Sequence, residues 1–308
     1  MQKNQSSVVG QLRGSAFLLL AALLWGIAFA AQSKGMDYVE PFTFNGARSF
    51  MGVAVLVPLW LLLGRPQPES GYDPKALWLG GGLCGCMLFA ATSLQQIGLV
   101  TTSAGKSGFL TALYIVLVPV FGIFFGRRAG GNVWLAVVLA TAGLYLLCAV
   151  DGFDLAAGDL LTLLCAVCFA FQIMLVDKFA PHTNPMLLCA VEFAVCGLLS
   201  VPAMFIWEQP SLAGLWEARI PLLYTGIMSS AVAYTLQIIG QRDTDPAVAS
   251  LLMSFESVFS VLAGAVLLKE KLSAAELCGC VLVFAAILLA QFSPFEKVHK
   301  KGRKTETD

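Results

Sequence analysis

The amino-acid sequence predicts an all-α integral membrane protein of ten transmembrane helices, built from two inverted five-helix repeats. Three observations lead to this prediction: few charges, ten apolar runs of membrane-spanning length, and a match between the two halves of the chain. Of 308 residues, 58% are hydrophobic and 12% are charged, and the mean hydropathy is +0.79. Soluble domains carry about 25% charged residues, so we expect a multi-pass protein of the cell membrane, surrounded by the lipid bilayer.

The apolar runs are about 20 residues long, the length that a helix needs to cross a bilayer. Short polar breaks with turn-forming residues, such as Glu40-Pro41, separate them. The ten predicted spans are 15–33, 43–63, 76–99, 103–126, 132–150, 158–177, 186–207, 219–239, 246–268 and 273–292.

Lysine and arginine residues set the orientation, because they favour the cytoplasmic side of a membrane. With the N-terminus in the cytoplasm, thirteen of the nineteen lie on the cytoplasmic side and four on the outer side. Arg48 and Lys106 fall inside spans. We therefore predict that both termini are cytoplasmic. The formal net charge is zero, so no basic surface points to a nucleic-acid partner.

The two halves of the chain match under nearly constant shifts. A shift of 144 residues places Gly14 on Gly158, Lys34 on Lys178, Pro41 on Pro185 and Pro58 on Pro202, and a shift of 142 places Gln95 on Gln237, Gly98 on Gly240, Thr102 on Thr244, Val116 on Val258 and Gly122 on Gly264. This predicts a first repeat at 14–150 and a second at 158–292, with a cytoplasmic segment at 1–13 and a basic cytoplasmic tail at 293–308. Because five is odd, the copies would be inverted, which places a site near the midplane and permits alternating access.

Several short motifs, taken in order, resemble the EamA branch of the drug/metabolite transporter superfamily. They are Leu24-Trp25-Gly26, Pro41 with Arg48, Phe255-Glu256-Ser257-Val258, Leu268-Lys269-Glu270-Lys271-Leu272 and the helix of Gly279. The resemblance covers about residues 14 to 292 and implies an inverted-repeat transporter for small polar metabolites, often an exporter. Two positions depart from it, since Ser257 stands where the family often has proline, and Arg128 stands at the repeat position of Glu270.

Glu256 is the first candidate for substrate binding or coupling. It lies about ten residues into the ninth predicted span, near the midplane. A lone carboxyl there favours its protonated form, which suits a proton-coupled step. The alternative is a structural hydrogen bond to a neighbouring helix. Its repeat mate is Tyr114, a polar group at the same depth, so the pair predicts a central polar pocket.

Lys106 is the second candidate. It lies about three residues into the fourth span, so about 4–5 Å below the outer boundary. It could contact an anion or carboxylate, or form a gating ion pair. The alternative is that its ammonium group extends to the outer interface.

Arg48 and Glu192 occupy equivalent positions of the two repeats. Each lies about 9 Å deep, but from opposite faces of a core about 30 Å thick. Their heights then differ by about 12 Å, so we expect no direct pair and assign them as gate or structural charges, one in each half. Anchoring of the helix near the outer surface is the alternative for Arg48.

Other polar and aromatic side chains fall within the spans. The amides of Gln95, Gln96, Gln172 and Gln237 are candidates for binding a zwitterion or for holding helices together. Trp25 and Tyr234, together with Phe29, Phe169 and Phe255, are candidates for lining a pocket, and helix packing is the alternative.

The residue content argues against other functions. Nine cysteines lie in apolar segments with no histidine near them, so we expect them to pack as small apolar groups and predict no metal and no cofactor. We predict a secondary active transporter, an exporter, for a small polar or amphipathic metabolite such as an amino acid or a drug-like compound. A channel-like or sensor protein is the alternative. A membrane-embedded enzyme comes third, because no histidine lies in any span to act as a general base. Proton coupling is a candidate property, and a monomer and a homodimer both stay open.

Overall fold

The computed structural model describes residues 2–62, 73–102, 104–124, 126, 129–148, 157–267 and 273–291, which fold into helices and connecting turns without a strand. In chain order the helices are α1 (Gln2–Gly35), α2 (Pro41–Leu62), α3 (Pro74–Gly98), α4 (Ala104–Ala112), α5 (Tyr114–Phe124), α6 (Gly131–Cys148), α7 (Ala157–Phe179), the 3-10 helix η2 (Ala180–His182), α8 (Pro185–Trp207), α9 (Leu212–Glu217), α10 (Arg219–Leu223), the π-helix η3 (Tyr224–Ala233), α11 (Tyr234–Arg242), α12 (Pro246–Met253), α13 (Glu256–Leu267) and α14 (Ala274–Gln291). The predicted all-α class is confirmed. The predicted tail at 293–308 and the motif at Leu268-Lys269-Glu270-Lys271-Leu272 lie outside the described residues, as does Arg128.

Within the described residues, eight helical segments are long and apolar enough to cross a membrane. They are Gly10–Gly35, Pro41–Leu62, Pro74–Gly98, Ala104–Phe124, Ala157–His182, Pro185–Trp207, Arg219–Arg242 and Pro246–Ala263. The predicted spans 132–150 and 273–292 correspond to α6 and α14, whose apolar stretches, Gly131–Leu146 and Leu277–Leu289, are shorter.

Three helices begin in the same way, with a capping side chain followed by a proline. The side chain of Asp73 accepts a hydrogen bond from the amide of Lys75 at the start of α3. Asn184 caps α8 and Asp245 caps α12 in the same manner. A proline at the first helical position removes an amide that would have no partner there, and its fixed φ suits the helix. Each of these dipeptides therefore marks the start of its helix.

Two of the predicted spans are not continuous helices. The span that starts at Ala104 is interrupted at Leu113, between α4 and α5, and the span that starts at Pro246 is interrupted at 254–255, between α12 and α13. The amide of Leu113 bonds the carbonyl of Leu110 at 3.3 Å, and that of Phe255 bonds the carbonyl of Leu252 at 3.3 Å. These are three-residue turns in place of helical bonds. Tyr114 and Glu256 are therefore the first residues of new helices.

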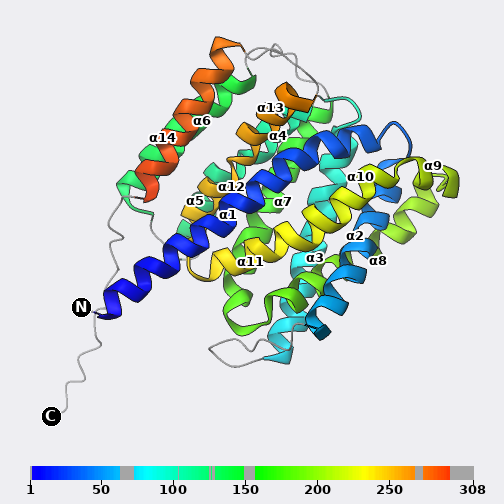
Figure 1. Cartoon of the computed structure of the whole chain (residues 1–308), viewed down its shortest axis with the longest axis horizontal. Helices are drawn as coiled ribbons and strands as arrows, with labels where there is room; N and C mark the ends of the chain where they lie inside the picture. Colours follow the sequence, from blue (N-terminus) through cyan, green and yellow to red (C-terminus); the bar gives the residue numbers. More distant parts are fainter. Residues whose placement is uncertain are drawn as a thin grey trace.

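The helices pack as a bundle with two flanking pairs (Figure 1). α6 and α14 lie side by side at one flank, and α2 and α8 pack together at the other. Between the flanks, α3 packs on α7, and α1 packs on α11, α12 and α13. This central group surrounds the polar side chains described below.

Two close crossings of the central helices require glycine. A Cβ on Gly98 of α3 would lie 2.8 Å from the carbonyl oxygen of Gly158 on α7. A Cβ on Gly14 of α1 would lie 2.9 Å from the carbonyl oxygen of Gly240 on α11. Real Cβ atoms do not approach backbone oxygen so closely, and small residues are the usual means of bringing membrane helices together. Both crossings join the N-terminal half of the chain to the C-terminal half.

Candidate functional site

A pocket lies among the central helices. Residues from both halves of the chain line it: Trp25, Phe29, Gln32, Arg48, Gln95, Thr111, Tyr114, Phe169, Gln172, Ile173, Ser229, Tyr234, Gln237, Met253 and Glu256. More than half of these residues are polar or charged, and aromatic rings make up most of the rest, so the pocket suits a ligand with polar groups and an apolar part. Of the predicted candidates, ten line the pocket: Glu256, Tyr114, Gln95, Gln172, Gln237, Trp25, Tyr234, Arg48, Phe29 and Phe169.

Tyr114 and Glu256 contact each other at the two helix breaks. The hydroxyl of Tyr114 donates to Oε1 of Glu256 at 3.0 Å, and both residues are buried. Each is the first residue of its helix, α5 and α13. The positive end of the α13 dipole favours a carboxylate at this position. The break therefore brings an acid and its hydrogen-bond donor to the wall of the pocket.

Two amides connect the pocket to a second buried carboxyl. Nε2 of Gln237 donates to Oε1 of Gln172 at 3.1 Å, and Nε2 of Gln172 donates to Oε1 of Glu192 at 2.7 Å. Glu192 is fully buried on α8 but does not line the pocket. Oε1 of Gln237 has no hydrogen-bond partner among the described residues. It is therefore a free acceptor at the pocket wall.

Arg48 and Glu192 have different partners. Nη1 of Arg48 donates to Oε1 of Gln32 at 2.6 Å, while Glu192 bonds Gln172. Arg48 lines the pocket and Glu192 lies behind Gln172. The two charges thus belong to separate parts of the polar network.

Aromatic rings form part of the pocket wall. Trp25 of α1 contacts Tyr234 of α11 edge to face, with ring centroids 4.8 Å apart. Tyr234 in turn contacts Phe193 of α8, with centroids 5.0 Å apart. Edge-to-face pairs at this distance add to the energy of simple burial. Phe29 and Phe169 also line the pocket, whereas Phe255 does not.

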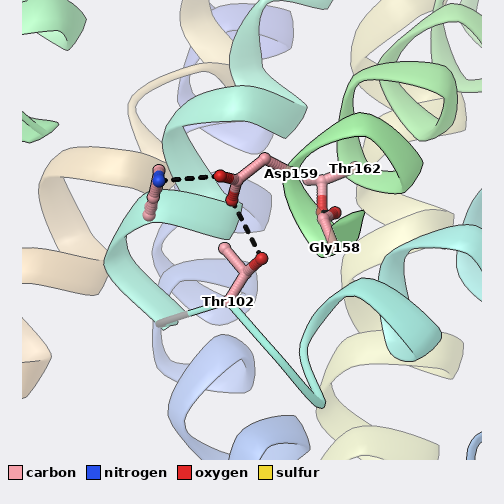
Figure 2. A network of polar contacts seen from close by, with 5 residues as sticks. Thr102, Gly158, Asp159 and Thr162 are labelled. Carbon is pink, nitrogen blue, oxygen red and sulfur yellow. Dashed lines mark hydrogen bonds and ion pairs between the residues drawn. The ribbon is translucent and has the colours of Figure 1, made fainter. Parts of the chain in front are cut away.

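Lys106 and Gln96 lie outside the pocket lining. Nζ of Lys106 forms an ion pair with Oδ2 of Asp159 at 2.7 Å, and the hydroxyl of Thr102 donates to Oδ1 of the same carboxylate at 2.9 Å. Figure 2 shows Asp159 reaching from α7 toward Thr102, beside Gly158 and Thr162. The Asp159 side chain is 0% exposed and that of Lys106 is 16% exposed. Gln96 is buried and bonds the main-chain oxygen of Gln32 at 3.3 Å.

The sequence interpretation missed several residues of this site. Asp159 lies at the start of the predicted span 158–177 and was not chosen as a candidate, yet it stands in the first turn of α7 and pairs with Lys106 of α4. Gln32 lies near the end of an apolar span, and nothing in the sequence marks it as the partner of Arg48. Thr111 was missed because threonine is common in membrane helices, although it accepts a hydrogen bond from Gln95 at 3.1 Å.

Gly26 of α1 positions α13 and hence Glu256. A Cβ on Gly26 would lie 2.5 Å from Cβ of Phe259 and 2.8 Å from the carbonyl oxygen of Glu256. We expect Gly26→Ala to lower the free energy of unfolding by about 1–3 kcal/mol, because the helices must move apart. Gly82→Ala is the matched control, since a Cβ on Gly82 meets nothing within 4 Å. Thermal unfolding in detergent, followed by tryptophan fluorescence, measures both, and equal midpoints would contradict the role of Gly26.

Comparison with known proteins agrees with a membrane transporter. The EamA-like transporter family matches residues 12–149 and 156–292. A protein of Archaeoglobus fulgidus named as a transporter is 28% identical over 295 residues, which cover 94% of this chain and 89% of that protein. YedA of Escherichia coli K12, named as an inner membrane transporter, is 26% identical and is covered over 90% of each chain. One crystal structure, at 22% identity, shares the fold, with a TM-score of 0.74 over 90% of this chain and 96% of its own.

Those relatives carry the word transporter in their names, and the family match spans nearly the whole chain in two parts. The match covers α1 to α6 in its first part and α7 to α14 in its second. This multi-pass membrane protein therefore belongs to the EamA-like transporter family.

Proposed function

We propose that the protein is a secondary active transporter that moves a small polar or amphipathic metabolite, such as an amino acid or a drug-like compound, by alternating access. One observation carries the proposal: the pocket is lined from both halves of the chain, with Tyr114 and Glu256 at the starts of two interrupted helices. Interrupted membrane helices at the junction of two repeats are a common construction of substrate sites in transporters.

Inverted repeats at 14–150 and 158–292 are part of the proposal. Their support is that related contacts occur twice. The turn bond from Leu113 to Leu110 and the one from Phe255 to Leu252 coincide under the 142-residue shift. The 142-residue shift places Gly98 on Gly240, and the 144-residue shift places Gly14 on Gly158. The crossing of Gly98 with Gly158 therefore corresponds to that of Gly240 with Gly14.

The membrane topology of the proposal has ten spans, with α6 and α14 as the fifth and tenth. α6 and α14 occupy equivalent positions in the two proposed repeats and pack on each other. The same holds for α2 and α8. Both termini, the segments 1–13 and 293–308, are then cytoplasmic, in agreement with the distribution of lysine and arginine.

Two polar links between the halves suggest how access alternates. At the outer end, Lys106 and Asp159 form a buried ion pair next to the Gly98–Gly158 crossing. At the inner end, Arg13 and Asp243 form an exposed pair at 3.4 Å. Exposed ion pairs contribute little, about 0–1 kcal/mol, so the inner end opens more readily. A pocket that loads from the cytoplasm is consistent with export.

A metabolite-wide thermal-shift screen of the purified protein tests the pocket, because a ligand that binds the folded state raises the unfolding midpoint. Compounds that stabilise the protein are then tested for saturable uptake into proteoliposomes. Uptake should be lost in Ser229→Phe, which places a ring in the pocket, and kept in Leu198→Phe on the exposed face of α8. Equal uptake by empty liposomes would overturn the proposal, and flux that never saturates would favour a channel. Comparison of inside-out with right-side-out vesicles tests the direction.

A further inference from the structure

Arg48 is buried at the pocket wall. It lies on α2, is 5% exposed and lines the pocket. The guanidinium lies over the ring of Phe44, 5.9 Å from its centroid, and Nη1 donates to Gln32. The side chain thus contacts the pocket and is buried within the helix bundle.

Among the described residues, Arg48 has no carboxylate partner. By contrast, Arg13 pairs with Asp243, Lys34 with Asp37 and Lys106 with Asp159. The two buried glutamates of the polar network have other partners, Tyr114 for Glu256 and Gln172 for Glu192. Arginine stays protonated in proteins, so this buried cation has no counter-ion within the part of the chain that the structure describes.

Unsatisfied polar atoms of the pocket describe a complementary ligand. Two are donors, Nε of Arg48 and Nε1 of Trp25, and one is an acceptor, Oε1 of Gln237. Buried polar atoms nearly always have partners, and a bound molecule can supply them. Such a molecule would carry an anionic acceptor group near Arg48 and at least one N–H or O–H donor for Gln237.

We propose that the substrate is a small organic carboxylate whose carboxylate group binds Arg48. This inference rests on the proposed transport function, since it assigns the ligand of the same pocket. The planar guanidinium can bond both oxygens of a carboxylate, and such charged bidentate pairs are among the strongest hydrogen bonds. The bond of Gln32 to Nη1 holds the guanidinium in place and leaves Nε for the ligand. The aromatic rings nearby suit an apolar remainder.

Matched pairs of probes test the carboxylate requirement on the full-length protein. The pairs are L-leucine with L-leucinamide and L-phenylalanine with L-phenylalaninamide, whose acids both carry an N–H donor. We expect at least one carboxylate to raise the unfolding midpoint of the wild type and its amide to do so only at about tenfold or higher concentration. Equal effects of acid and amide, or no effect of any carboxylate, would overturn the inference.

Substitutions then locate the effect. Arg48→Gln should weaken carboxylate binding by about tenfold or more, and Arg48→Lys, which keeps the charge without the planar group, should weaken it less. Arg219→Gln, an exposed arginine that stacks on Trp216, should leave binding unchanged. Unchanged binding in Arg48→Gln counts against the site. The comparison of acids with amides in the wild type decides the outcome even where a variant fails to fold.

The two proposals fail in different ways. Saturable transport of amides or other uncharged compounds, with no preference for acids, would support the transport function and contradict the carboxylate site. Binding of carboxylates without any transport across the membrane would support the Arg48 site and contradict the transport function.

Discussion

Glu256→Gln is expected to abolish uptake driven by a proton gradient and to leave substrate binding measurable. Glutamine keeps the shape of the side chain and can still accept the hydrogen bond that Tyr114 donates at 3.0 Å. It cannot bind or release a proton, so a step that depends on proton exchange stops. Glu256 is the carboxyl that lines the pocket within the described residues, which makes it the group we propose for coupling.

Three measurements check this expectation with one compound from the screen. Uptake under an imposed pH gradient should fall to the level of protein-free liposomes, whereas exchange of labelled for unlabelled substrate without a gradient should persist. The thermal shift by the compound should also persist. Glu192→Gln is the matched control, because Glu192 is buried but reaches the pocket only through Gln172. Normal gradient-driven uptake in Glu256→Gln would contradict the coupling role of Glu256. If only Glu192→Gln lost gradient-driven uptake, Glu192 would be the coupling residue.

Asp159→Asn is expected to lower the free energy of unfolding by about 3 kcal/mol. The substitution removes the carboxylate from Lys106 and weakens the bond from Thr102, at a site where the aspartate is 0% exposed. Breaking a buried ion pair costs more than the pair contributes, because the remaining charge loses its partner away from water. Thermal unfolding in detergent measures the loss.

A double-mutant cycle separates the ion pair from the rest of the contact. Lys106→Met with Asp159→Asn should recover part of the stability that Asp159→Asn loses, because no buried charge is then left over. Additive losses would show that the two side chains do not interact energetically. Lys106→Met should also change the binding of acids and amides alike, in contrast to Arg48→Gln, since Lys106 does not line the pocket. If Lys106→Met weakened the binding of acids but not of amides, Lys106 would be a residue that contacts the substrate directly.

Much of this molecule can be predicted from local sequence pattern. Apolar runs and capped proline breaks predict the helices, because hydrophobicity and turn chemistry act over a few residues. The internal match pairs Tyr114 with Glu256, and the two side chains share a hydrogen bond in the fold. The pairing has a physical basis in the proposed inverted repeats, since equivalent positions of two such copies reach the same height where both lie near the midplane.

The helix breaks at 113 and 254–255 could not be predicted in this way. Neither contains a proline or a glycine, the residues that usually mark an interruption. The turn near Glu256 is held by packing instead, for example by the bond from Ser257 to the carbonyl of Gly108 at 2.9 Å. Which carbonyl faces which hydroxyl depends on helices from opposite halves of the chain.

The stretch around Lys106 shows which features the sequence determines and which depend on the tertiary structure. The sequence predicts that this lysine lies inside a membrane helix, where it contacts an anion, forms an ion pair or extends to the outer interface, because a charge at membrane depth is costly in any fold. The choice of Asp159, and of Gln32 for Arg48, came from helix packing. Hydropathy depends on each segment by itself, whereas the partner of a buried charge depends on which distant segments approach it.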